Sequence, residues 1–390
     1  MSEPVTGSEG DPTYPSLPSS LSPFRVKART SEGGLQWFNR LRAKYTYYGT
    51  THLPGLDDLI RHCRPAQPDL RPGDCLSLYG RPGSGKSALL YYFALTTILP
   101  SAWSPCKGAP SVHLGGKGLP VVWIDMDGSF QPYRMASLIH HHFDRCISLA
   151  SSTSISSNTP SDPIDLSELL QLSLDRLLIF RPSSSRQLLS LLSSTLPSLL
   201  LSLPHPPSLL LLDPVNLFDS IDAPLSAALD GAFDPLGLGR KASSSSSSKR
   251  ASHNTFPTGP YHRPLAQAYR RLVRQWSPLV LLSLRWPFPE WEEQGSMGLH
   301  GSNGDSRAWK ECMPSWLHGM ETIRLWLSPL HAPAPSSPSP SPSPSPEANL
   351  SPPCLIQVQG KGSTRADCPK MIFEIAEDGL FDLTSSLLSS

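Results

Sequence analysis

Cysteine pairs at the spacing of a metal or redox motif are missing from this sequence. Its seven cysteines are scattered, none of them in a C-x-x-C pattern, and their number is odd. Such a distribution is typical of proteins that keep reduced thiols inside the cell. The pattern therefore argues against a disulfide framework and against a zinc module.

An apolar signal sequence and a membrane-spanning stretch are also missing. Residues 1–23 are rich in Ser, Pro and Gly, so we expect a disordered tail and no secretion. The most apolar segment, 188–203, is interrupted by serines and by Pro197 and is short for a bilayer. We predict that it forms a buried core helix and that the protein has no membrane contact.

The chain has no surplus of charge of one sign. It carries 33 Lys and Arg against 32 Asp and Glu, a formal net charge of +1, which gives no overall attraction to nucleic acid. Contact with DNA must then come from local basic groups. The serine run at 243–248 is flanked by Arg240, Lys241, Lys249 and Arg250. We weigh a phosphate contact or a nuclear import signal there against a plain solvated insertion.

Proline, in contrast, is abundant. The 43 prolines are twice the usual share of about 5% and cluster with serine. We therefore expect disordered insertions at 223–262 and 331–350 within a folded core that spans 49–385. The second insertion contains the Ser-Pro repeat 336–346, which is typical of a flexible linker.

Residues 24–48 differ from the tail before them, because apolar residues recur there at helical spacing. These residues are Leu35, Phe38, Leu41 and Tyr45. We predict a short helical segment that docks a partner subunit. The alternative is a helix that packs on the main domain.

A phosphate-binding loop is the most specific motif of the chain. The pattern G-x-x-x-x-G-K-S is complete, and its residues are Gly80, Arg81, Pro82, Gly83, Ser84, Gly85, Lys86 and Ser87. An apolar strand precedes the loop and an apolar helical pattern follows it. The motif predicts binding of ATP with Mg²⁺. Lys86 would contact the β and γ phosphates, and the Ser87 hydroxyl would hold the metal.

Two further apolar stretches end in carboxylates. The stretch 121–130 contains Asp125 and Asp127, and the stretch 208–216 runs through four leucines to Asp213. We predict that Asp127 is the general base that activates water, or alternatively a helix cap. Asp213 has the position of a Walker B aspartate, which supports Mg²⁺.

The order of the apolar stretches predicts an α/β fold. Strands are expected at 73–80, 121–130, 176–182, 208–216 and 279–286, with helices between them. A helix at 264–276 would carry Arg270, Arg271 and Arg274 on one side. Three late strands, at 320–327, 354–360 and 371–382, would extend the sheet.

In motif order the chain resembles the RecA-type recombinases, and within them the eukaryotic recombinase paralogues. The phosphate loop, IDMDGSF, LLLLD, LLSLR and the closing strands carry this resemblance over residues 49–382. It implies a RecA-like P-loop ATPase core with a mostly parallel central sheet, helices on both faces and late antiparallel strands.

The same resemblance implies a nuclear protein of homologous-recombination repair. It would bind ATP, join other recombinase paralogue subunits and assist recombinase loading on single-stranded or branched DNA at double-strand breaks. Two departures from the family pattern bear on catalysis. Asp127 stands where the recombinase has a longer glutamate, and Arg285 stands where the family has a glutamine that senses the γ phosphate. We therefore expect weak or absent ATPase activity.

Two other functions share the phosphate loop. An active DNA-dependent ATPase of the same fold would be stimulated by single-stranded DNA. A small-molecule P-loop kinase would need an arginine-bearing lid and an acceptor pocket, and the late strands have no counterpart there.

Overall fold

The computed structural model describes most of the expected core. The described residues are 33–34, 37–38, 48–64, 69–104, 111–153, 166–219, 221–222, 261–285, 313–317, 320, 323–329, 354–360, 370–376 and 379–382. The tail 1–23, nearly all of segment 24–48 and nearly all of the two expected insertions lie outside them. From the predicted docking segment, Trp37 and Phe38 are described and are 52% and 57% exposed.

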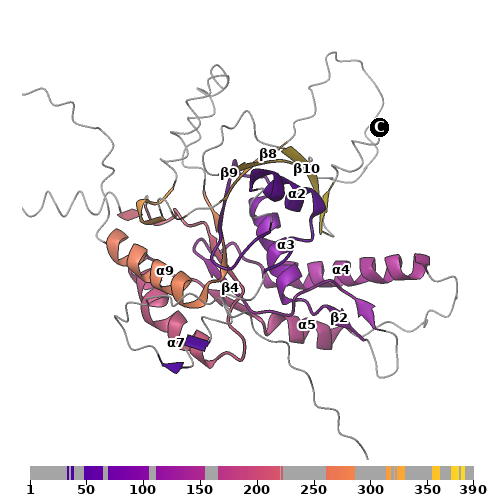
Figure 1. Cartoon of the computed structure of the whole chain (residues 1–390), viewed down its shortest axis with the longest axis horizontal. Coiled ribbons are helices and arrows are strands. Elements are labelled where there is room, and N and C mark those ends of the chain that lie inside the picture. The colour runs from indigo at the N-terminus through magenta and orange to yellow at the C-terminus, as the bar shows by residue number, and fades with distance from the viewer. Residues whose placement is uncertain are drawn as a thin grey trace, which may run out of the picture.

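A nine-stranded sheet forms the centre of the described part (Figure 1). Its strand order is β11-β10-β9-β8-β1-β7-β6-β4-β5. The strands are β1 (Cys75–Gly80), β4 (Val121–Asp125), β5 (Leu177–Phe180), β6 (Leu209–Asp213), β7 (Leu279–Ser283), β8 (Ile323–Pro329), β9 (Cys354–Gly360), β10 (Lys370–Ala376) and β11 (Gly379–Asp382). A separate pair consists of β2 (Ala102–Trp103) and β3 (Val112–His113).

The sheet changes from parallel to antiparallel pairing at β8. Strands β5, β4, β6, β7, β1 and β8 pair in parallel, whereas β9, β10 and β11 continue the sheet antiparallel. The α/β fold class with late antiparallel strands is thus confirmed. The stretch 371–382, however, forms two strands instead of one. Ala376 pairs with Gly379, so only two residues separate the two antiparallel strands, the length of the commonest hairpin connections.

Helices cover both faces of the sheet. They are α2 (Pro54–Cys63), α3 (Lys86–Ile98), α4 (Pro132–Thr153), α5 (Ser167–Leu174), α6 (Ser185–Ser190), the π-helical turn Leu191–Thr195, α7 (Leu196–Ser202), α9 (His262–Trp276) and the 3-10 turn Ser315–Leu317. In Figure 1, α9 and α7 lie on one side of the sheet, and α3, α4 and α5 lie on the other.

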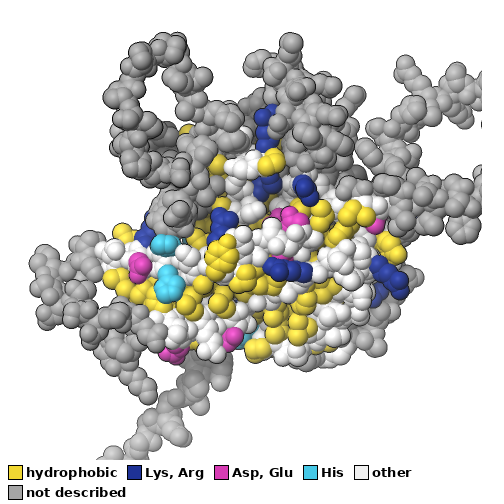
Figure 2. All heavy atoms as spheres, turned by 180° about the vertical axis from the view of Figure 1, so that it is seen from behind, with side chains coloured by type: hydrophobic (Ala, Val, Ile, Leu, Met, Phe, Trp, Pro, Cys, Tyr) yellow, Lys and Arg dark blue, Asp and Glu magenta, His cyan; other side chains and the backbone are white. Residues whose placement is uncertain are grey.

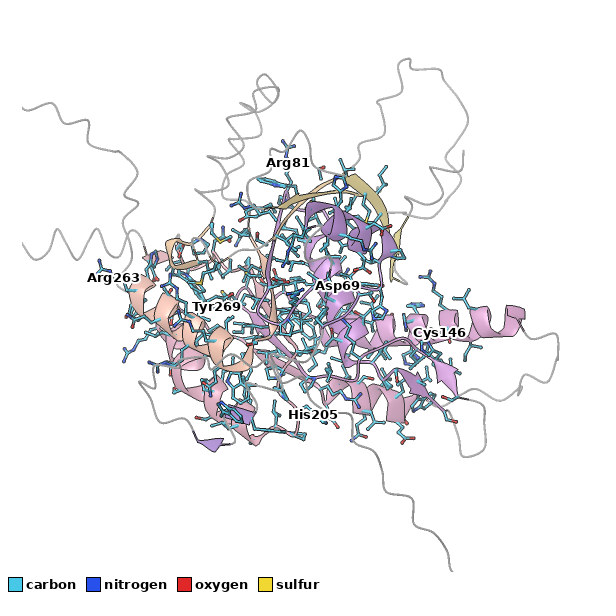
Figure 3. The ribbon with its side chains drawn as sticks, in the orientation of Figure 1. Asp69, Arg81, Cys146, His205, Arg263 and Tyr269 are labelled. Carbon is cyan, nitrogen blue, oxygen red and sulfur yellow. The ribbon has the colours of Figure 1, made fainter. Side chains whose placement is uncertain are left out.

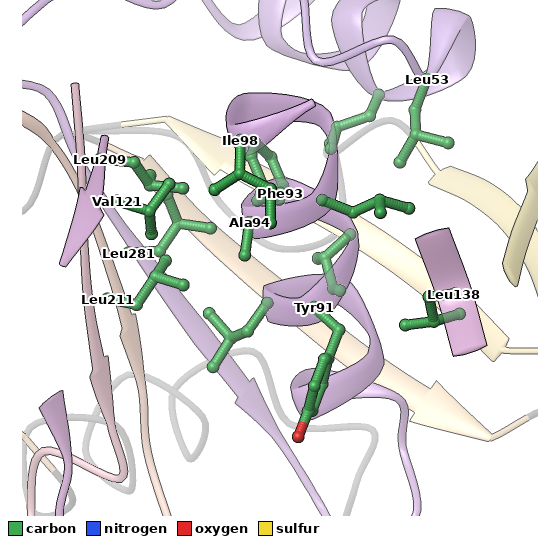
Figure 4. Close-up of a cluster of buried hydrophobic side chains, with 14 of the residues drawn as sticks. Leu53, Tyr91, Phe93, Ala94, Ile98, Val121, Leu138, Leu209, Leu211 and Leu281 are labelled. Atoms are coloured by element: carbon green, nitrogen blue, oxygen red, sulfur yellow. The ribbon is translucent and has the colours of Figure 1, made fainter. Parts of the chain in front are cut away.

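Each central strand supplies two cores, because successive side chains of a strand point to opposite faces. In β6, Leu209 and Leu211 join the core under α3, whereas Leu210 and Leu212 join the core under α9. Strands β4 and β7 divide their residues in the same way. Figure 4 shows the first core, in which Phe93 and Ile98 of α3 pack against the strands. The continuous apolar runs of the sequence therefore mark strands that are buried on both faces.

The apolar segment 188–203 is helical and packs on the second core. Leu188, Leu192, Leu196 and Leu200 are at most 2% exposed and cluster with residues of α9. The prediction of a buried core helix is confirmed. Among the helices that the structure describes, none is both long enough and apolar enough to span a bilayer.

The face of the molecule seen from behind is chemically mixed, in agreement with the net charge of +1. In Figure 2, which shows the molecule from behind, hydrophobic side chains spread over much of the face, with basic, acidic and histidine side chains scattered among them. This face gives no sign of one dominant charge.

Candidate nucleotide site

The phosphate loop joins the end of β1 to the start of α3. Gly83 and Gly85 have φ angles of +75° and +88°, a conformation that is easily adopted only by glycine. A Cβ atom on Gly83 would have no neighbour within 4 Å, whereas one on Gly80 would lie 2.4 Å from the backbone oxygen of Leu327. The loop is therefore packed against β8 at its base and open at its tip, where a phosphate could approach the backbone.

Lys86 lies across the loop that precedes it. Its Nζ atom donates hydrogen bonds to the backbone oxygens of Gly80, at 2.6 Å, and of Arg81, at 2.9 Å. Burial lowers the pKa of Lys86 to about 8, and the carboxylate of Asp213 opposes this shift. The ammonium group has lost much of its water and is held by neutral carbonyls, so an anion at the loop would favour its charged form.

Asp213 lies at the carboxyl edge of the sheet, beside Asp125. The two aspartates are register partners in β6 and β4, and the Met126 amide donates to the Asp213 backbone oxygen at 2.7 Å. Burial raises the pKa of Asp213 to about 6, the hydrogen bond from the Ser283 hydroxyl lowers it, and the charges of Asp127 and Asp125 raise it further. A cation at this position would relieve the buried negative charge.

Asp127 lies at the same edge, but its side chain faces solvent. Its Oδ1 atom accepts a hydrogen bond from the Ser129 amide at 3.1 Å, which is a turn contact within the loop and not a helix cap, since α4 begins only at Pro132. Its charge is nevertheless close enough to raise the pKa of Asp213. The role of general base stays a prediction.

An ion pair that the sequence analysis missed, between the half-exposed Arg181 and the buried Asp125, fixes the loop that carries Asp127. Asp125 is fully buried and accepts the amides of Ser129, at 3.0 Å, and Phe130, at 3.2 Å. Arg181, which follows β5, donates to Asp125 at 2.9 Å and to the Phe130 backbone oxygen at 2.7 Å. The two residues are 56 positions apart, so only the pairing of β4 with β5 brings them together.

A second missed contact ties the segment after β6 to the segment after β7. The Asn216 side chain accepts the Arg285 amide at 2.8 Å and donates to the Arg285 backbone oxygen at 2.8 Å. The Arg285 side chain is exposed. The backbone of Arg285 is thus held through both its amide and its carbonyl oxygen.

The residues present fit a nucleotide with a divalent cation. The loop offers open backbone at Gly83, Lys86 offers a cation, and Ser87 is exposed at the first turn of α3. The Ser84 hydroxyl is buried and has no hydrogen-bond partner among the described atoms, so the loop retains an unused donor. Asp213 supplies the buried carboxylate that a Mg²⁺ site needs.

Comparison with known proteins gives a partial match. No family model matches the chain. The DNA repair protein XRCC2 homolog of Arabidopsis thaliana is 31% identical to it over 72 residues, which are 18% of this chain and 18% of that relative. The chain is similar to a DNA repair protein. The match spans less than one fifth of the relative's own length.

Among solved structures, the crystal structure of the RadB recombinase aligns with 85% of this chain and 97% of that chain. The TM-score is 0.41 and the sequence identity is 14%.

Proposed function

We propose that this protein is an ATP-binding recombinase paralogue, a counterpart of XRCC2, that acts in homologous-recombination repair. The observation that carries the proposal is that Lys86, on an open glycine loop, lies close enough for its charge to interact with the buried Asp213 at the carboxyl edge of the parallel strands. The similarity to a DNA repair protein selects recombination among the functions that use such a site.

Each site residue has a role toward ATP. Lys86 would exchange its two carbonyl partners for the β and γ phosphates, and the amides around Gly83 and Gly85 would surround the phosphate chain. Ser87 and Asp213 would hold Mg²⁺, directly or through water. The bound metal would neutralise charge on the phosphates.

Slow or absent ATP turnover is part of the proposal. A carboxylate on the short Asp127 side chain, engaged by the Ser129 amide, is poorly suited to activating an in-line water. Arg285 replaces the glutamine of the family pattern, and Asn216 holds its backbone in place. The protein would therefore act mainly by assembly. In the nucleus it would join other recombinase paralogue subunits and help load a recombinase on single-stranded or branched DNA.

The first test is the substitution Lys86→Ala, with Arg186→Ala as its control. Arg186 is exposed on α6, so the two variants lose the same charge. Removal of a cation from a phosphate costs about 1.5–3 kcal/mol, which corresponds to ATP affinity roughly 10- to 100-fold weaker. Titration with a fluorescent ATP analogue measures the affinity, and only Lys86→Ala should weaken it.

The same two variants, purified from DNA-damaged cells, test the biological role. Mass spectrometry should find recombinase paralogue subunits with the wild-type chain and with Arg186→Ala. Recovery of no such subunit, together with phosphorylation of a small molecule, would show a kinase. An ATPase rate near that of an active recombinase, abolished by Asp127→Ala, would refute slow turnover.

A further inference from the structure

Helix α9 carries a row of arginines that the nucleotide site does not use. Arg263, Arg270, Arg271 and Arg274 are all exposed, and in the described part of the chain none of them forms an ion pair. The helix contains no acidic residue. Its outer face therefore has charge of one sign, on a protein whose net charge is only +1.

The spacing places these arginines opposite the buried side of the helix. Positions 263, 270 and 274 follow a seven-residue and then a four-residue step, which keeps them on one face. The buried face of α9 includes Leu265, Tyr269, Leu272 and Trp276, which pack on the second core. In Figure 3, Arg263 projects from the outer end of α9, and Tyr269 lies further along the helix.

The row begins near the nucleotide edge of the sheet and runs away from it. The Nε2 atom of His262 lies 3.4 Å from Oδ1 of Asp219, so the start of α9 is close to the segment that follows Asp213. The other end of α9 leads through Ser277 into β7. With a rise of 1.5 Å per residue, the row from Arg263 to Arg274 is about 16 Å long.

The chemistry of this face suits a phosphate backbone better than a protein partner. Protein interfaces depend on buried aromatic and aliphatic anchors, and none of the exposed large hydrophobic residues of the described chain lies on α9. Guanidinium groups bind phosphates in a bidentate way. Contacts to phosphates alone position a nucleic acid without reading its sequence.

We propose that the outer face of α9 is a DNA phosphate contact surface, formed by Arg263, Arg270, Arg271 and Arg274. This inference deepens the proposed function, on which it rests, and assigns DNA contact to a rigid helix. The binding is independent of base sequence and depends strongly on salt concentration.

The test is binding of a fluorescein-labelled 30-nucleotide oligo-dT by the full chain, measured by fluorescence anisotropy between 50 and 200 mM salt. The variant is Arg270→Ala with Arg274→Ala, and the control is Arg61→Ala with Arg186→Ala, which removes two exposed arginines elsewhere. Loss of two phosphate contacts should make the negative slope of log K against log salt shallower by about 1.4. It should also weaken binding at 0.1 M salt roughly 10- to 30-fold. The control pair should bind as the wild type does.

The variant Arg270→Lys with Arg274→Lys should keep most of the salt dependence, because the charge is kept. Equal losses in the α9 variant and the control, or no binding of oligo-dT by the wild-type chain, would overturn the inference. Loss of partner subunits with DNA affinity unchanged would show a protein-binding face instead. The α9 variant should bind ATP as the wild type does, because its nucleotide site is unchanged. ATP titration of this variant therefore separates a failure of the DNA contact surface from a failure of the nucleotide site.

Discussion

At the scale of single residues, the charged groups of the candidate site, Lys86 and Asp213, are largely buried away from water. Asp213 is 5% exposed, and its carboxylate is charged at neutral pH only at a free-energy cost, because burial raises its pKa to about 6 from 3.8. Ser283 and Lys86 offset part of this cost. Such a group is better suited to a bound cation than to an empty site.

The substitution Asp213→Asn should therefore stabilise the protein while it weakens Mg²⁺-dependent binding. The folded-state pKa is raised, so the group's contribution to stability is full below about pH 4 and is lost as pH rises through about 6. At pH 7 the variant should gain about 1–3 kcal/mol in free energy of unfolding, measured in urea, and the gain should fade toward pH 4.

ATP titrations complete this prediction. The variant should bind ATP more weakly than the wild type with Mg²⁺ present and equally well in EDTA. The control Asp144→Asn changes an exposed carboxylate of α4 and should alter neither property. A loss of ATP affinity that persists in EDTA would contradict a metal role for Asp213.

The sequence was sufficient to mark the candidate site residues that share a local motif, and their roles stay predictions. Gly80 to Ser87 form one continuous motif, and Asp213 closes an apolar run. Arg181 and Ser283 could not be predicted in the same way, since their partners Asp125 and Asp213 are 56 and 70 positions away. An aspartate at the end of a buried strand does signal a need for partners, but the signal does not say which residues supply them.

At the scale of elements, the contact between Asn216 and Arg285 joins the ends of two neighbouring strands. Both hydrogen bonds measure 2.8 Å, and they fix the chain where β7 leaves the sheet. One amide side chain thus holds two segments that are 69 positions apart.

Loss of this contact should loosen the segment after β7 without unfolding the core. We expect Asn216→Ala to cost about 1 kcal/mol or less of stability and to speed tryptic cleavage after Arg285. Asn216→Asp keeps the acceptor and loses the donor, so trypsin should cleave this variant at an intermediate rate. Peptide mapping by mass spectrometry checks this, and equal cleavage rates in all three proteins would contradict it.

The elements were predictable where one pattern dominated the local sequence. Continuous apolar runs predicted the central strands because those strands are buried on both faces. The short pair β2 and β3 could not be predicted, since two-residue strands carry no periodic pattern. The hairpin of β10 and β11 was predicted as one strand, because only two residues separate its strands and apolar residues continue on both sides of them.

At the scale of the whole molecule, the antiparallel half of the sheet depends on a long connection. Pro329 of β8 pairs with Cys354 of β9, so residues 330–353 join two strands that are already neighbours. Deletion of residues 336–347, which roughly halves this connection, should leave the fold intact. It should change the free energy of unfolding by no more than about 0.6 kcal/mol, in the favourable direction.

Urea denaturation and circular dichroism check this prediction, with deletion of residues 323–334, an equal length that includes all of β8, as a destructive control. A loss of several kcal/mol on removing the repeat would mean that it takes part in the fold.

The five residues of strand β6 serve three purposes. Its odd-numbered leucines fill one core, its even-numbered leucines fill the other, and its last residue brings a carboxylate to the nucleotide edge. Exchange of one of these leucines for another aliphatic residue disturbs the packing of only one core. Insertion or deletion of a single residue would turn every leucine to the opposite face and move Asp213 along the strand. The length of β6 is thus constrained more tightly than its composition.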